Sequence, residues 1–343
     1  MESGASDSGR ASSPPGLDGD PTRQFRVPGQ SPHLLLAIVE DLSREDLGCY
    51  GARWLKTPRM NEIAEQGLRH TRLAGSASGQ GVERTALWFG ELPPTPPEGK
   101  LQRLPRTSLP EMLWQAGFAP TLLGDCSWAG GGAAGQGGWH HSYGWDEQDG
   151  TKFDTYPRAV RRDGRAEQVT DNAEIEATRF ERLLFDEAKR ALVEHEETHR
   201  PVALVVTLRL RWWRDAKYVN VAFEHENWTA AEKEHASAIL AVDRLIGEIG
   251  RQVEKSIGAR RTIIAVVGLP REKPSPELTR FAGANIEKEA ALSGKQRWPY
   301  APLIVRWPGR IQAGSVMTSF CGFQDLLPTF GEMVQARQTP REI

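Results

Sequence analysis

The chain has 343 residues, with 43 lysine and arginine residues against 45 aspartate and glutamate residues and a formal net charge of −2. This length is enough to bury a substantial core, either as one large α/β domain or as two ordinary domains. The balanced charge offers no attraction for nucleic acid or for an anionic membrane, so we expect neither as a partner.

Residues 1–31 differ in composition from the rest of the chain. They are rich in Ser, Gly, Pro and Asp, and after Met1 their only sizeable apolar groups are Leu17, Phe25 and Val27. Such a segment cannot bury enough surface to offset the entropy lost on ordering. We therefore predict a disordered N-terminal tail over residues 1–31.

The same tail lacks the basic-then-apolar pattern of a secretory signal. The first apolar run, Leu34–Val39, is six residues long and far too short to span a bilayer. Three scattered cysteines, Cys49, Cys126 and Cys321, fit reduced thiols better than a disulfide framework. These features predict a cytoplasmic protein.

Strand-like and helix-like segments alternate along the chain after the tail. The aliphatic run Leu34–Val39 is typical of a strand covered on both faces, and Thr57 can cap a helix that has Pro58 in its first turn. Helices between successive strands imply crossover connections, so we predict a mostly parallel sheet with helices on both faces. The further predicted helices are Ser108–Ala116, 172–195, Ala236–Ile249 and Gln324–Val334, and the further strands are Leu68–Leu73, Phe118–Leu123, Val202–Leu208, Thr262–Val267 and Ala301–Trp307.

Several short motifs follow one another in a fixed order between Pro32 and Gly90. An apolar run ends in Glu40-Asp41, the segment DLGCYG begins at Asp46, and QGVERTALWFG begins at Gln80. This order resembles the N-terminal signature of the sulfatase family, in which a strand ends in two metal-binding acids and a later helix begins with a catalytic Cys or Ser. Further segments that resemble the family are Gly138–Trp145, Pro201–Thr207, Ala236–Asp243 and Pro302–Thr329.

The resemblance covers nearly all of residues 32–335 and implies the alkaline-phosphatase-like fold. This fold is an α/β sandwich around a large, mixed but mostly parallel central sheet. We expect residues 32–335 to form this domain and residues 336–343 to form a C-terminal tail. In the family a C-terminal subdomain follows; the chain stops at Ile343, so we expect that subdomain to be absent.

The nucleophile of the family is a formylglycine made from Cys or Ser, and by the resemblance its position holds Gln80. A primary amide cannot become an anionic nucleophile or an aldehyde hydrate, so covalent catalysis fails here. Arg84 is the retained polar residue of this motif. It either contacts an anion or, as we prefer, binds Glu40 or Asp41 structurally.

Family members hold calcium with two acids after the first strand, which are Glu40 and Asp41 here, and with side chains of a later loop. That loop has Leu269 and Pro270 at the ligand positions. Calcium requires six to eight oxygen donors, and these two side chains supply none. We therefore expect no cofactor, and calcium only if the family site survives; otherwise Glu40 and Asp41 are solvated acids at a strand end.

The Lys and His that act on the sulfate group in the family fall on Asp125 and Ser127. Asp125 would then place a negative charge where a sulfate oxygen lies, which repels the family substrate. Another family histidine falls within Arg211–Trp213 and is replaced as well.

The adjacent histidines His140 and His141 are a candidate pair of metal ligands. Consecutive residues on a regular strand or helix point in different directions. We therefore predict that both are loop residues rather than zinc ligands.

Two functions follow from these substitutions. The one we prefer is a catalytically inactive sulfatase-fold protein that binds an anionic or extended ligand in the former pocket, which we expect to be open to solvent, or that binds a protein partner. The alternative is an active hydrolase of sulfuric or phosphate esters, which the family implies; a shifted alignment would then make Ser76 or Ser78 the nucleophile. The first is favoured because nucleophile, metal-ligand, Lys and His positions are all changed together.

Overall fold

The structure is a computed structural model, which describes residues 31–75, 80–92, 107–129, 138–146, 153–213, 223–271, 277–278, 280–281 and 300–336. Most of both predicted tails, together with Ser76 and Ser78, lies outside the described residues. The strands are β1 (His33–Glu40), β2 (Leu68–Ala74), β3 (Ala119–Asp125), β4 (His141–Trp145), β5 (Ala159–Arg162), β6 (Arg165–Gln168), β7 (Val202–Arg209), β8 (Thr262–Leu269), β9 (Tyr300–Arg306), β10 (Ser315–Met317) and β11 (Cys321–Gly322).

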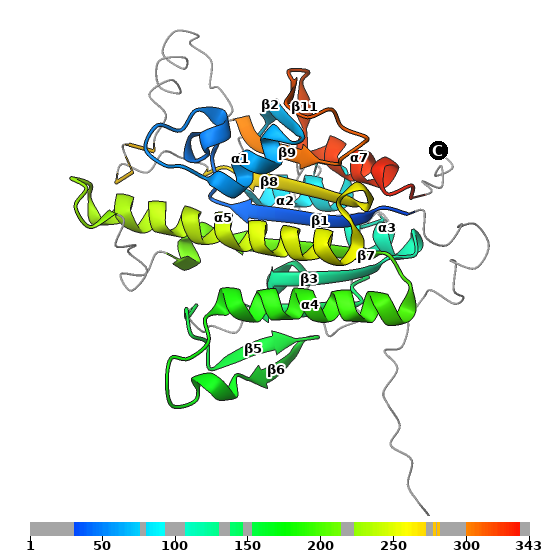
Figure 1. The fold of residues 1–343 in the computed structure, drawn as a ribbon, viewed down its shortest axis with the longest axis horizontal. Coiled ribbons are helices and arrows are strands. Elements are labelled where there is room, and N and C mark those ends of the chain that lie inside the picture. The colour runs from blue at the N-terminus through cyan, green and yellow to red at the C-terminus, as the bar shows by residue number, and fades with distance from the viewer. Residues whose placement is uncertain are drawn as a thin grey trace, which may run out of the picture.

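These strands form one 11-stranded sheet in the order β10-β2-β9-β8-β1-β7-β3-β4-β5-β6, with β11 beside β2 (Figure 1). The centre of the sheet is parallel: β1 pairs with β7 and β8, and β3 pairs with β7 and β4. Antiparallel pairs flank this centre, at β8–β9, β9–β2, β4–β5 and β5–β6. The predicted fold class, a mixed and mostly parallel central sheet between helices, is confirmed.

Helices cover both faces of the sheet because β1 is apolar on both sides. Leu35, Ala37 and Val39 belong to one buried cluster and Leu34, Leu36 and Ile38 to the other, and each is at most 1% exposed. Burying such a side chain stabilises the fold by roughly 1.5–3 kcal/mol for the larger residues. The first cluster lies under α1 (Pro58–Glu65), α4 (Phe180–Thr198) and α5 (Ala230–Ile257), and the second lies under α2 (Gln80–Phe89), α3 (Leu109–Gln115) and α7 (Leu326–Met333) (Figure 1).

The predicted helix over 172–195 begins too early, since α4 starts at Phe180. The amide of Asn172 explains the difference. Its Oδ1 accepts hydrogen bonds from the backbone N–H groups of Ala177 (3.1 Å) and Thr178 (2.8 Å), which holds the preceding segment as a loop. Asparagine side chains compete with helical hydrogen bonds in this way.

None of the helices in the described part of the chain is long and apolar enough to cross a lipid bilayer.

Candidate functional site

The central parallel strands end at one edge of the sheet, where open α/β sheets bind their ligands. Glu40 ends β1, Asp125 ends β3, Arg209 ends β7 and Leu269 ends β8. In the register of the sheet, Glu40 pairs with Arg209 on one side and with Leu269 on the other. Strand pairing alone thus brings the predicted acids together with an arginine.

Arg209 joins the two buried acids of this edge. Its Nη2 lies 2.5 Å from Asp125 Oδ2 and its Nε lies 3.2 Å from Glu40 Oε2. The same Nη2 also donates a hydrogen bond to Ser127 Oγ at 3.3 Å. Asp125 is fully buried, and the Arg209 side chain is only 10% exposed. Ion pairs at such depth depend on both partners, because an unpaired buried charge is strongly unfavourable.

Asp125 is held in place by its own backbone and by its neighbours. Its N–H donates to Thr207 Oγ1 at 3.0 Å, and its Oδ1 accepts from the Ser127 N–H at 3.0 Å. The negative charge that we expect Asp125 to place at the sulfate position is thus paired with the positive charge of Arg209.

Glu40 is paired with a second arginine from the helix that begins at Gln80. Arg84 Nη2 forms an ion pair with Glu40 Oε1, which confirms the structural interpretation of Arg84. Burial raises the pKa of Glu40, and the charges of Arg84 and then Arg209 oppose that rise. Glu40 is 4% exposed, so the alternative expectation that it is a solvated acid at a strand end is wrong, while the open pocket expected around Glu40, Asp41, Gln80 and Arg84 stays a prediction.

Gln80 fills the position of the nucleophile with a hydrogen-bonding amide. Its Nε2 lies 3.1 Å from Asp41 Oδ1, 3.2 Å from the Leu269 carbonyl oxygen and 3.3 Å from the Pro270 carbonyl oxygen. Asp41 turns toward it with a left-handed backbone (φ 64°), a conformation that aspartate tolerates better than most residues. Three oxygen atoms therefore converge on an N–H₂ group.

The oxygen atoms around Gln80 do not fit the calcium ion of the family. Both oxygens of Glu40 already face guanidinium groups, and Asp41 Oδ1 and the carbonyl oxygens of Leu269 and Pro270 accept from the Gln80 amide. The Leu269 side chain is a fully buried hydrocarbon. A calcium site needs several oxygen ligands that are free to surround the ion, and here these five oxygens are paired with donors of the protein.

Sequence reasoning placed Glu40, Asp41, Gln80, Arg84, Asp125 and Ser127 in one site, and the structure brings them together. It missed Arg209. The signal was a charged residue directly after the buried strand Val202–Leu208, at the same edge as the two acids. A cation at that point is explained by the carboxylates on the neighbouring strands.

A second buried charge cluster lies beside the first strand end. Asp46 is fully buried and lies 2.8 Å from His235 Nε2, with Arg271 Nη2 at 3.6 Å. Burial favours the neutral acid, but the contact with His235 and the charge of Arg271 outweigh it and hold the pKa of Asp46 below its usual range. Asp46 is thus paired with side chains of the protein itself, and these contacts anchor the loop after β1.

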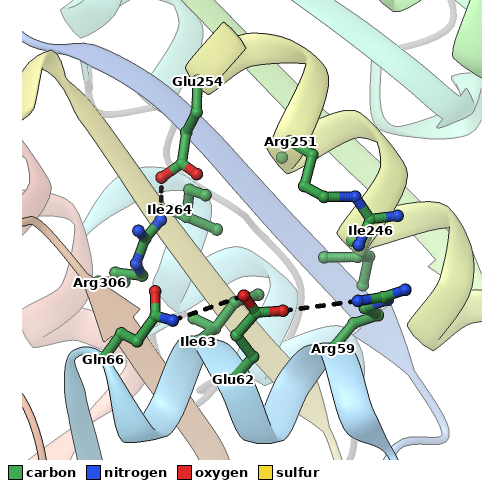
Figure 2. Close-up of a pocket in the computed structure, with 11 residues that line it drawn as sticks. Arg59, Glu62, Ile63, Gln66, Ile246, Arg251, Glu254, Ile264 and Arg306 are labelled. Carbon is green, nitrogen blue, oxygen red and sulfur yellow. Dashed lines mark hydrogen bonds and ion pairs between the residues drawn. The ribbon is translucent and has the colours of Figure 1, made fainter. Parts of the chain in front are cut away.

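A small hollow lies between α1 and α5, near the amino end of β8 and so away from the strand-end site (Figure 2). Charged pairs border it: Glu62 lies 3.6 Å from Arg59, and Glu254 pairs with Arg306. Its volume of about 30 Å³ is the space of one or a few waters. We assign it no ligand.

The fold and the strand-end site together define an α/β protein of the alkaline-phosphatase-like type. A sequence model of the Sulfatase family matches residues 32–336, and the chain belongs to that family. The N-acetylgalactosamine-6-sulfatase of Sus scrofa is 25% identical over 353 aligned residues, which cover 88% of this chain and 62% of the relative. The steryl-sulfatase of Rattus norvegicus is 38% identical over 66 residues, 19% of this chain and 11% of that protein. The chain thus spans less than two thirds of these relatives.

Solved structures show the same fold. The crystal structure of Ps i-CgsB superposes with a TM-score of 0.69 at 18% identity, covering 90% of this chain and 73% of the other. The PsFucS1 sulfatase from Pseudoalteromonas sp. gives a TM-score of 0.59 at 19% identity, covering 90% of this chain and 68% of the other. At such identities the likeness concerns the fold alone.

Proposed function

We propose that this chain is a sulfatase-family protein without sulfatase activity, which acts by binding an anionic or extended ligand or a protein partner. The observation that carries the proposal is the Gln80 amide, which donates to Asp41 and to two carbonyl oxygens at the place where the family has nucleophile and metal. An amide nitrogen can neither attack a sulfur centre nor form an aldehyde hydrate.

The charges around Gln80 support the same proposal. Arg84 and Arg209 pair with Glu40, one of the two acids that bind the metal in the family, and Arg209 also pairs with Asp125. Guanidinium groups satisfy carboxylates through fixed hydrogen bonds, but they do not generate a nucleophile as a metal does. The site is therefore stable as it stands and lacks a reacting group.

The three cysteines support a reducing, cytoplasmic compartment for this protein. Cys49, Cys126 and Cys321 are all free thiols. Burial raises the pKa of Cys49 to about 11 and that of Cys321 to about 11, so both stay protonated and unreactive at neutral pH.

The purified chain is expected to hydrolyse neither an aryl sulfate nor an aryl phosphate above the buffer rate, with or without calcium. The measurement is chromogenic turnover, with an active sulfatase as the positive control. Intact mass is expected to match the unmodified sequence, without formylglycine.

Two matched variants sharpen this test. Ser76→Ala and Ser78→Ala remove the hydroxyl groups that a shifted alignment would use, and neither is expected to change the rate. Turnover by the wild type that disappears in one of these variants would overturn the proposal and establish an ester hydrolase with a serine nucleophile.

A further inference from the structure

A cluster of imidazoles and carboxylates lies far from the strand-end site. His140 Nε2 is 2.5 Å from Glu194 Oε1, and His141 Nε2 is 3.4 Å from Glu194 Oε2. In the described part of the chain, these three residues form a group whose ligand atoms all lie within 4.8 Å of one another. His141 begins β4, so the cluster lies at the amino end of the parallel strands, opposite Glu40.

The prediction that both histidines are loop residues holds for His140 but not for His141, which begins β4. His140 precedes β4 and its N–H donates to the Pro120 carbonyl oxygen at 2.8 Å, so it does not follow the alternation of the strand. The two rings approach to 4.5 Å between centroids at an angle of 60°. Glu194, in the last turns of α4, faces both.

Asp163 supports this arrangement from the hairpin between β5 and β6. Its Oδ2 lies 3.3 Å from His141 Nδ1, and its Oδ1 accepts from the Ser142 N–H at 2.9 Å. A carboxylate on the far nitrogen of an imidazole fixes the ring with its Nε2 directed at Glu194. This is the outer contact that metal-binding histidines commonly have.

We propose that His140, His141 and Glu194 bind one zinc ion, with Asp163 as the carboxylate that orients His141. Two imidazoles and one carboxylate are a ligand set that zinc accepts, and the mixed nitrogen donors disfavour calcium and magnesium. The His140 contact is to Glu194 Oε1 and the His141 contact is to Glu194 Oε2, so the carboxylate faces both rings, and one ligand atom of each residue can reach the same ion. The fourth position is left for water.

The test is titration of the full chain with zinc chloride in competition with a chromogenic chelator. We expect one zinc ion per chain for the wild type. His140→Ala and Glu194→Gln are expected to abolish binding, and Asp163→Asn to weaken it by about 10- to 100-fold. His225→Ala, which changes an exposed histidine outside the cluster, is the matched control and should keep full binding.

Circular dichroism of each variant checks that it is folded. Glu194→Gln conserves the shape of the side chain, so it separates loss of a ligand from loss of structure. Zinc binding that is absent in the wild type, or that persists equally in the His140 and Glu194 variants, overturns the proposal and leaves the cluster as an ion pair. This outcome is independent of the strand-end site, which shares no residue with the cluster.

Discussion

Replacing Arg209 with methionine is expected to destabilise the protein by about 3–5 kcal/mol at neutral pH, because it leaves two buried carboxylates without their shared partner. Asp125 is fully buried and Glu40 is 4% exposed, so water cannot solvate these carboxylates in place of Arg209. The measurement is urea denaturation of both proteins. Arg209→Lys keeps the positive charge but not the guanidinium group that contacts both acids. Its free energy of unfolding should fall by less than that of Arg209→Met.

The loss is expected to depend on pH through Glu40. Because the folded-state pKa of Glu40 is raised above 4.5, its contribution to stability is highest below that value and falls as pH rises toward the folded pKa. Without the positive charge of Arg209 the folded-state pKa of Glu40 rises further, so the pH range over which its contribution falls becomes wider. The difference in unfolding free energy between variant and wild type should therefore shrink at acid pH.

A matched arginine on the surface gives the control. Arg251→Met, at an exposed position of α5, is expected to change stability by no more than about 0.5 kcal/mol. An Arg209→Met variant as stable as Arg251→Met, or with the same deficit at every pH, would contradict the assigned role of Arg209.

Gly124→Ala is expected to lower the free energy of unfolding by about 4 kcal/mol or more, because Gly124, directly before Asp125, has no room for a side chain. Its φ is +104°, and a Cβ added there would lie 2.0 Å from the Thr207 carbonyl oxygen on β7. The backbone of β3 or β7 would have to shift, and such a shift is costly because the interior is close-packed. Thermal and urea unfolding measure the loss.

Gly258→Ala separates the two causes. Gly258 has nearly the same φ, +101°, but nothing lies within 4 Å of the added Cβ. We expect it to cost only the dihedral strain, about 1–2 kcal/mol. If both alanine variants lost the same amount, the close approach of β3 and β7 would not be what requires Gly124.

The fold could be predicted from the sequence because its elements depend on local patterns. Leu34–Val39 had to be buried on both faces, and Pro58 marked a helix start. The predicted cap by the Thr57 side chain is wrong, because Thr57 Oγ1 accepts from the Gly48 N–H instead. The short strands β5 and β6 were missed, since they carry little apolar periodicity and depend on pairing with β4.

The residues of the site could be predicted from the sequence, but the ion pairs between them could not. Motif order located Glu40, Gln80 and Asp125, yet the neutralisation of both acids by Arg209 required the register of β1, β3 and β7. The approach of His140 and His141 to Glu194 likewise depends on where β4 begins, which no local pattern determined.

Calcium in the purified chain after dialysis, determined by elemental analysis, shows directly whether the strand-end site holds a metal. We expect no calcium above the buffer level, because guanidinium groups face both oxygens of Glu40 and the Gln80 amide donates to Asp41 Oδ1. One calcium ion per chain that resists dialysis, and that Asp41→Asn removes, would contradict it and restore the metal site of an active sulfatase.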